Sequence, residues 1–273
     1  MQDSECVAFL QWALPRLRMR WPGYRKVRRQ VCKRVARRLD SLGLADTSAY
    51  RTYLEIHPDE WRQLDELCHI PISRFYRDRA VFEYLGLNVL PALAKAAEAQ
   101  GLGRIQVWNA GCGAGEEPYT LAILWRFSLQ QRFPELKLQI LATDVDREQL
   151  DRAMAACYTG GSLRQLPAEW IGSAFKEIGD RYSLQPKFRA GVEFRQQDIR
   201  YELPNGPFDL VLCRNLVFTY FEEELQREIA SSLYDRLVPG GVLVLGIHEV
   251  LPQGTAGFHL LEPRLHVYRR EVS

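Results

Sequence analysis

The sequence predicts an α/β protein with a doubly wound, mostly parallel sheet that follows an all-helical N-terminal domain. Three observations support this fold class. From residue 104 onward, apolar strands alternate with helical segments, as in sheets whose crossover connections are helices. A glycine-rich turn joins the first strand to the next helix. The preceding residues carry the spacing of amphipathic helices, so we expect domains at 1–90 and 91–273.

The N-terminal domain is predicted to consist of short helices. Val27, Val31, Val35 and Leu39 recur every four residues, which gives one apolar stripe on a helix rich in arginine. Asp46 precedes the next helical stretch and can cap it, because its carboxylate accepts hydrogen bonds from exposed backbone N–H groups. Further helices are expected over residues 58–67, 79–88 and 91–100.

The sheet domain is predicted to begin with a strand over residues 104–109. The alternation continues with helices at 117–126, 147–156 and 222–237 and strands at 137–143, 193–198, 209–213, 242–246 and 266–269. A turn is expected at residues 239–241 (PGG). Between 158 and 191 short polar pieces interrupt the alternation, with one strand expected at 182–185, and we interpret this stretch as an insertion.

Composition restricts the environment and the partners. No apolar run approaches the roughly 20 residues that span a bilayer, and the histidines and cysteines lack metal-ligand spacing. The six cysteines are scattered without a C-x-x-C pair, so we expect reduced thiols and a cytoplasmic location. Eleven Lys and Arg residues and no acid lie between Cys6 and Leu39, although the net charge is only +2. This stretch indicates either an anionic partner or a solvated helix face.

The glycine turn at residues 111–115 is the most informative motif. Turns of this kind usually bind phosphate, because glycine lets the backbone approach the ligand and a helix N-terminus favours anions. Here Glu116 and Glu117 stand where a pyrophosphate would be expected, and they would repel it. They favour a cofactor that is cationic or rich in hydroxyl and amine donors. S-adenosylmethionine fits this requirement, whereas NAD does not.

Two acids follow later strands of the predicted sheet. Asp144 ends the second strand, where a carboxylate can accept both hydroxyls of a ribose. It lies 33 positions after Gly111, a longer spacing than the roughly 20 residues of the dinucleotide fingerprint. The alternative is that Asp144 caps the next helix. Asp198 ends the third strand and either meets an adenine edge or belongs to a surface turn.

Two further segments indicate the same site. Residues 73–78 (SRFYRD) combine a hydroxyl, aromatic rings and a guanidinium. Residues 213–221 (CRNLVFTYF) follow the fourth strand, where the reactive end of a ligand would lie. An aromatic run after a strand usually belongs to the core, but the polar pair Arg214 and Asn215 at its head favours a functional site.

Together these motifs resemble the chemotaxis receptor methyltransferase family (the CheR type) over nearly the whole chain. The resemblance rests on residues 75–78 (FYRD), 110–119 (AGCGAGEEPY), 142–146 (ATDVD) and 213–215 (CRN), in this order. It implies a Rossmann-like methyltransferase sheet, an N-terminal helical domain and a small antiparallel subdomain inserted at about 158–192.

The resemblance also implies roles for individual residues. Arg77, Arg214 and Tyr220 are the expected catalytic residues, with Arg214 and Tyr220 near the methyl group and the incoming substrate. No metal is expected. The cofactor, S-adenosylmethionine, is expected to contact Ser73, Arg77, Gly111, Gly113, Glu117, Asp144, Asp198, Ile199, Arg214 and Asn215.

Two features depart from the family pattern. Residues 70–73 (IPIS) keep only a hydroxyl where the family usually has Thr-Asn-x-Thr. The family reaches its Tyr-Phe pair four residues after Cys-Arg-Asn, whereas Tyr220 is the fifth residue here. This extra residue lies where the methyl acceptor should dock, so a different protein or a small-molecule acceptor stays open.

The leading hypothesis is methylation of glutamate side chains on a chemoreceptor or related signalling protein. A glutamate, with a reference pKa of about 4.3, is already a carboxylate at neutral pH, so no general base is required. Arg28, Arg29 and Arg37 would dock on an acidic helical surface of that partner, without membrane insertion. Besides another acceptor, the alternative is a non-catalytic, cofactor-binding regulator whose basic arm binds nucleic acid.

Overall fold

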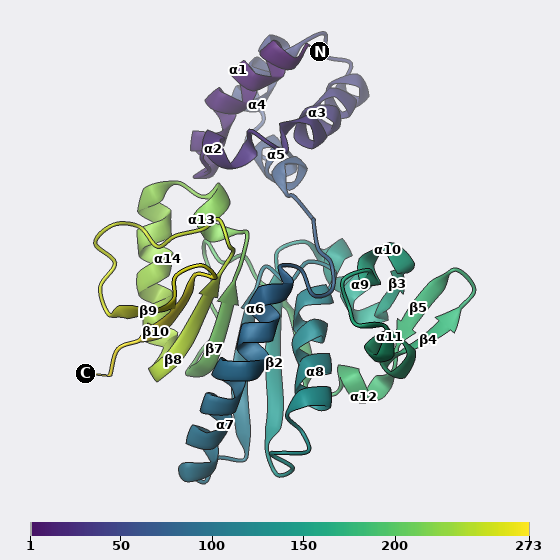
Figure 1. Cartoon of the computed structure of the whole chain (residues 1–273). Helices are drawn as coiled ribbons and strands as arrows, with labels where there is room; N and C mark the ends of the chain where they lie inside the picture. Colours follow the sequence, from purple (N-terminus) through teal and green to yellow (C-terminus); the bar gives the residue numbers. More distant parts are fainter. Residues whose placement is uncertain (1, 273) are drawn as a thin grey trace. The chain divides into compact units, whose positions relative to one another are not determined.

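The computed structural model describes residues 2–272, which form two compact units (Figure 1). The helical unit comprises the chain up to Ile70 together with Leu216–Gln226, and the sheet unit comprises Pro71–Asn215 and the chain from Arg227 onward. The chain therefore passes between the units three times. The units part after Ile70 rather than near residue 90, the boundary expected from the sequence.

The helical unit is built from short helices whose apolar stripes face one another. Val31, Val35 and Leu39 are buried along one side of the arginine-rich helix α3, as their spacing predicts. Asp46 caps α4, because its carboxylate accepts a hydrogen bond of 2.8 Å from the backbone N–H of Ala49. The helices of residues 2–70 are α1 (Asp3–Ala13), the 3₁₀ turn η1 (Leu14–Leu17), α2 (Trp21–Tyr24), α3 (Arg28–Leu42), α4 (Thr47–Ile56) and α5 (Glu60–Cys68).

A disulfide bond joins α1 to α3 in the helical unit. It links Cys6 to Cys32, whose Cα atoms lie 5.9 Å apart, so the expectation of reduced thiols is wrong for this pair. The packing of the two helices, which sequence spacing does not reveal, brings the cysteines within bridging range. The remaining cysteines, Cys68, Cys112, Cys157 and Cys213, are thiols.

The segment Leu216–Gln226 is part of the helical unit although it lies far from it in sequence. It contains α13 (Val217–Tyr220) and the first residues of α14 (Glu223–Arg236). The backbone N–H of Arg20 donates to the carbonyl of Tyr220 at 2.8 Å, and Met19 forms a β-bridge with Phe221. Backbone pairing therefore fixes this segment to the turn before α2.

The sheet unit contains a seven-stranded sheet in the order β6-β2-β1-β7-β8-β10-β9. The first five strands in this order run parallel to one another, and β10 pairs in an antiparallel manner with both β8 and β9. The predicted doubly wound, mostly parallel sheet is thus confirmed. The strands are β1 (Arg104–Ala110), β2 (Lys137–Asp144), β6 (Val192–Gln196), β7 (Phe208–Cys213), β8 (Leu237–Leu245), β9 (Phe258–Glu262) and β10 (Val267–Arg270).

The turn expected at residues 239–241 is instead an irregularity within β8. Phe208 pairs with Leu237 but Leu210 pairs with Val242, so the extra residues of β8 bulge out of the ladder and the strand continues. Strand β9, which pairs with β10, was not expected from the sequence.

Helices cover the sheet, and α7 and α8 run alongside it in Figure 1. Val81, Phe82 and Leu90 belong to the same buried cluster as the sheet residues Val107 and Leu210, which explains why the units part before α6. The helical elements are α6 (Arg79–Tyr84), the π-helical η2 (Leu85–Val89), α7 (Leu90–Ala99), α8 (Glu116–Ser128), α9 (Arg147–Ala155) and most of α14.

The predicted insertion forms a separate three-stranded antiparallel sheet in the order β3-β5-β4, as expected. The ring of Phe75 packs edge-on against Tyr158 and Phe175 of this subdomain, with centroids 4.8 Å and 5.3 Å away. Its elements are β3 (Cys157–Thr159), α10 (Gly160–Leu163), α11 (Ala168–Ala174), β4 (Phe175–Ile178), β5 (Arg181–Leu184) and α12 (Pro186–Arg189).

Candidate functional site

The glycine turn leaves the carboxyl end of β1 and is tied to the end of β2. The backbone N–H groups of Gly111 and Cys112 both donate to the carbonyl of Thr143, at 2.8 Å and 3.0 Å. Gly115 has φ +87°, and a Cβ atom there would lie 2.9 Å from the Cβ of Ala153. Only glycine therefore allows the turn to enter α8 beside α9.

Asp144 closes the turn from the adjacent strand. Its Oδ2 accepts a hydrogen bond of 2.7 Å from the N–H of Gly113, and its Oδ1 accepts one of 3.0 Å from the N–H of Asp146. The N-cap of α9 is Asp146, which accepts from the N–H of Gln149, so the alternative that Asp144 caps this helix is wrong. The Asp144 carboxylate instead lies directly against the glycine turn.

Arg214 is enclosed by two carboxylates. Its guanidinium binds Glu117 through one nitrogen and Asp78 through the other, the second at 2.6 Å, and its side chain is fully buried. Asn109 donates to the other oxygen of Glu117 at 2.7 Å. The structure thus brings together residues from β1, α8, the segment before α6 and the end of β7, four parts of the sequence that were expected to form one site.

Arg77 differs from Arg214 in its partners. Its two terminal nitrogens donate to neutral oxygens, the carbonyl of Ile72 at 2.8 Å and Oδ1 of Asn215 at 3.0 Å. In the described residues it forms no ion pair with a carboxylate. Its positive charge is therefore not balanced at close range, which suits the binding of an anionic group.

Ser73 and Tyr76 connect this segment to the first turn of α8. The hydroxyl of Thr120 accepts a hydrogen bond of 3.1 Å from the N–H of Tyr76 and donates to the carbonyl of Glu116 at 2.6 Å. Burial raises the pKa of the Glu116 carboxyl above its usual value, and the nearby side chain of Ser73 offsets this in part.

Glu249 is a buried carboxylate of the site that sequence reasoning missed. Its Oε2 accepts hydrogen bonds from the backbone N–H groups of Asn215, at 2.6 Å, and of Gly246, at 2.8 Å. The residue follows β8, and an acid after a buried apolar strand was the signal available in the sequence. Asn215, which follows β7, lies 34 positions away, so the contact depends on the pairing of β7 with β8.

Asp198 and Ile199 lie in the turn after β6. Asp198 pairs with Arg200 at 2.6 Å, and its carbonyl accepts from the N–H of Tyr201, which is the geometry of a tight turn. The strand ends at Gln196 rather than at Asp198. A contact of Asp198 and Ile199 with adenine stays a prediction.

Tyr220 lies in the helical unit, in α13. Its ring packs against that of Tyr24, with centroids 5.1 Å apart. The segment that holds it, Leu216–Gln226, begins immediately after Asn215. A catalytic role for Tyr220 stays a prediction.

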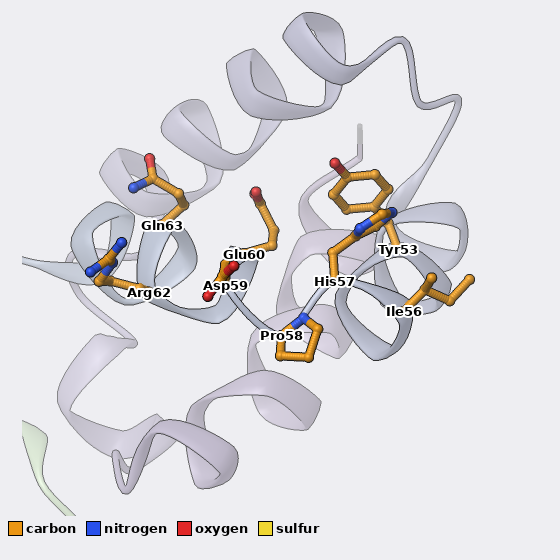
Figure 2. Close-up of a pocket in the computed structure, with 8 residues that line it drawn as sticks. All are labelled: Tyr53, Ile56, His57, Pro58, Asp59, Glu60, Arg62 and Gln63. Carbon is orange, nitrogen blue, oxygen red and sulfur yellow. The ribbon is translucent and has the colours of Figure 1, made fainter.

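A hollow of about 340 Å³ lies in the helical unit where α4 leads into α5 (Figure 2). Tyr53 and His57 lie next to each other on one side of it in Figure 2. Their ring centroids are 4.1 Å apart and the rings are tilted by 38° to one another. None of the predicted site residues lines it. Its remaining lining residues are Ile56, Pro58, Asp59, Glu60, Arg62 and Gln63.

The side chains around the glycine turn fit S-adenosylmethionine better than a phosphate-bearing cofactor. Three carboxylates, Asp78, Glu117 and Asp144, lie at the turn and on its neighbouring elements. The Oδ1 of Asn109 and the Oε2 of Glu116 are buried acceptors without a partner in the described residues, and a ligand rich in donors would satisfy them. Arg77 supplies one cation for a carboxylate. In the described residues, no group of three His, Cys, Asp or Glu side chains could hold a metal ion.

Fold and site together define an α/β domain that binds a cationic nucleoside cofactor at the carboxyl ends of parallel strands. Residues 72–266 match the family model described as "CheR methyltransferase, SAM binding domain". The chain belongs to the CheR methyltransferase family. Its cofactor is S-adenosylmethionine.

Curated relatives agree with this assignment. A chemotaxis protein methyltransferase of Listeria innocua serovar 6a is 36% identical over 189 residues, which are 68% of this chain and 69% of that protein. One from Klebsiella aerogenes is 31% identical over 242 residues, or 85% of this chain and 79% of that protein. An uncharacterized 104.1 kDa protein of Rhodobacter capsulatus is 32% identical over 242 residues, which are 88% of this chain but 25% of that protein.

Similarity to solved structures is low. The N-methyltransferase NodS from Bradyrhizobium japonicum WM9 is 17% identical, with a TM-score of 0.36, over 63% of this chain and 62% of that chain. This likeness carries no functional argument.

Proposed function

We propose that the protein transfers the methyl group of S-adenosylmethionine to glutamate side chains of a chemoreceptor or related signalling protein. The relatives named as chemotaxis protein methyltransferases support a role in chemotaxis signalling. The observation that supports a carboxylate acceptor is that Glu117 and Asp78 are both ion-paired with the buried Arg214, which makes them poor general bases for an amine or hydroxyl acceptor. A carboxylate acceptor needs no base, because it is deprotonated at neutral pH.

The residues of the site have separate tasks in this proposal. When bound, S-adenosylmethionine supplies a methyl group on a positively charged sulfur. Arg77 binds the carboxylate of the cofactor's amino acid end, and Glu117 accepts from its ammonium group. Arg214 holds Glu117 and Asp78 in place, and Asp144 orients the ribose. Alignment of acceptor oxygen, methyl carbon and sulfur then supplies most of the rate enhancement, about 7–11 kcal/mol in well-oriented reactions.

The basic helix α3 is proposed as the docking surface for an acidic helix of the partner. The structure divides its basic residues into two groups. Arg28 pairs with Asp3 at 3.0 Å, Arg38 pairs with Glu60 at 2.6 Å, and Arg34 donates to backbone carbonyls. Arg29, Lys33 and Arg37 are exposed and pair with no carboxylate in the described residues. Their spacing of four places them on one face of the helix, which we name the basic face.

The position of the methyl group tests the acceptor. Receptor-bearing membranes are incubated with the purified protein and S-adenosylmethionine, and receptor peptides are then sequenced by mass spectrometry. Methyl groups are expected on glutamate side chains, and a receptor with those glutamates replaced by alanine should take up none. Methyl groups on lysine, arginine or the α-amino group would contradict the proposal.

A second candidate keeps the cofactor and changes the acceptor to another protein or a small molecule. The extra residue before Tyr220 favours it, because this segment differs in length from the family pattern. In the same experiment this candidate predicts methyl transfer in a cell extract from which the receptors have been removed. The cytoplasmic location also stays a prediction; in the described chain, no helix is long and apolar enough to cross a bilayer.

A further inference from the structure

One carboxylate oxygen of Glu249 connects the residues that follow β7 and β8, Asn215 and Gly246. Oε2 of Glu249 accepts from the N–H of Asn215 and from the N–H of Gly246. The N–H of Glu249 donates to the carbonyl of Gly246 at 2.8 Å, which closes the loop that carries it. Glu249 is only 1% exposed, so its hydrogen bonds to these N–H groups lie in a place that water does not reach.

These hydrogen bonds hold Asn215 in an unusual backbone conformation. Asn215 has φ +56°, in the left-handed region that residues other than glycine adopt only rarely. A Cβ atom on Gly246 would lie 2.8 Å from Oε2 of Glu249 and 3.1 Å from Cγ of Asn215, so the three residues fit together only because position 246 is glycine. Such strain persists where the surroundings fix it, and it is concentrated at functional sites.

The side chain of Asn215 transmits this arrangement to Arg77. Its Oδ1 accepts from Arg77 at 3.0 Å, and this is one of two hydrogen bonds that orient the guanidinium. The backbone conformation of Asn215 sets the direction of its side chain. Through Asn215, Glu249 therefore affects the orientation of the Arg77 guanidinium, although it does not contact Arg77 itself.

We infer that Glu249 is a positioning residue for cofactor binding, which acts through Asn215 to hold Arg77 against the carboxylate of the cofactor's amino acid end. The inference rests on the proposed role of Arg77. It assigns Glu249 an effect on one end of the cofactor only. The adenosine end, which we place at the glycine turn and Asp144, should not depend on it.

The test compares two ligands of the purified protein by calorimetry. S-adenosylhomocysteine carries the amino acid end, whereas methylthioadenosine has the same nucleoside without it. Glu249→Ala should weaken binding of the first about tenfold, as expected for loss of a hydrogen bond that orients a charged group. Binding of methylthioadenosine should be unchanged. Equal weakening of both ligands would overturn the inference.

Further variants separate positioning from general stability. Glu249→Gln should restore affinity, because a single oxygen accepts both bonds and the amide oxygen can replace it. Asn215→Gly removes Oδ1 and still permits the left-handed backbone, so it should show the same ligand-selective loss even if Glu249→Ala does not fold. Asp209→Asn is the matched control. It alters a half-buried carboxyl that accepts from the N–H of Gln106 at the other end of β7, and both affinities should stay unchanged.

A double-mutant cycle tests the route through Arg77. If Glu249 acts on the carboxylate through this residue, adding Glu249→Ala to Arg77→Ala should weaken S-adenosylhomocysteine binding no further. Independent, multiplying losses would contradict the route. If the wild-type protein binds neither ligand, the proposed function itself fails, and that result is distinct from each outcome above.

Discussion

Two arginines of the site, Arg77 and Arg214, have different electrostatic surroundings. Arg214 is fully buried between Glu117 and Asp78, and a buried guanidinium is tolerated only where carboxylates and good geometry replace its water. Its charge is already balanced, so it is suited to hold acids in place. Arg77 has neutral partners only in the described residues, which makes it the better candidate for an anionic group of the cofactor.

Glu116 provides a prediction for the pH dependence of stability. Burial raises the folded-state pKa of Glu116 above the model value of 4.5, so the folded protein binds this proton more tightly than the unfolded chain. The contribution of the protonated Glu116 carboxyl to the free energy of unfolding is therefore fully present below pH 4.5, and it is lost as the pH rises through the folded-state pKa. Glu116→Gln should remove this loss, because the amide does not titrate.

Urea unfolding of wild type and Glu116→Gln between pH 4 and pH 8 measures the effect. The stability of the variant relative to wild type should increase as the pH rises above 4.5. A difference that stays constant over this range, or that moves in the opposite direction, would show that the carboxyl is not perturbed as burial requires.

At the scale of the elements, the helical unit depends on how α1 packs on α3. The disulfide joins residues that are 26 positions apart, and Cys6, one of the two bonded cysteines, is completely buried. Restriction of the unfolded chain by a loop of this length contributes about 3–4 kcal/mol in the chain-entropy model. Disulfides are rare in cytosolic proteins, so this bond is unusual for the predicted cytoplasmic location.

Reduction of the disulfide should lower the free energy of unfolding of the helical unit by up to about 3–4 kcal/mol. Denaturant unfolding with and without reductant measures this change. Cys32→Ala should behave like the reduced wild type and should not respond to reductant, while its affinity for S-adenosylhomocysteine stays normal. Equal stability of oxidised and reduced wild type would contradict the expected contribution.

Charge reversal on the basic face of α3 should impair docking of the receptor without impairing cofactor binding. Replacing Arg29, Lys33 and Arg37 with Glu should raise the KM for receptor at least tenfold and leave cofactor affinity unchanged, because these residues pair with no acid in the described chain. Arg28 is left out, since its reversal would also repel Asp3. The matched control places Glu at Lys95, Arg132 and Lys137, exposed residues of the sheet unit, and should not change this KM. Similar defects in both triple variants would show that net charge, rather than the basic face, governs docking.

At the scale of the whole molecule, the features that depend on local sequence could be predicted. The alternation of strands and helices predicted the parallel sheet, and the glycine turn predicted the junction of β1 and α8. Asp144 was expected at the turn because the carboxyl ends of neighbouring parallel strands meet at one edge. Asp144, but not Asp146, was considered as the cap of the next helix, because the position of an acid alone does not show which of the two begins the helix.

Features that depend on tertiary packing could not be predicted. Arg214 meets Asp78 across 136 positions of sequence and Glu117 across 97, and no local pattern indicates such pairing. The same holds for Glu249 and Asn215 and for the disulfide between α1 and α3. The assignment of Leu216–Gln226 to the helical unit follows from backbone pairing with residues 18–20, which the sequence of neither segment reveals.

The central claim is that this site, with Arg77 binding the cofactor's carboxylate, transfers a methyl group to a carboxylate. The most direct measurement uses receptor-bearing membranes and cofactor labelled in its methyl group, followed by mild alkali. We expect label on the receptor that alkali releases as methanol, because methyl esters hydrolyse in base. The Arg77→Ala variant should label slowly at low cofactor concentration and recover at high concentration. Label that is stable in alkali would show that the acceptor is not a carboxylate, since methylated amines survive this treatment.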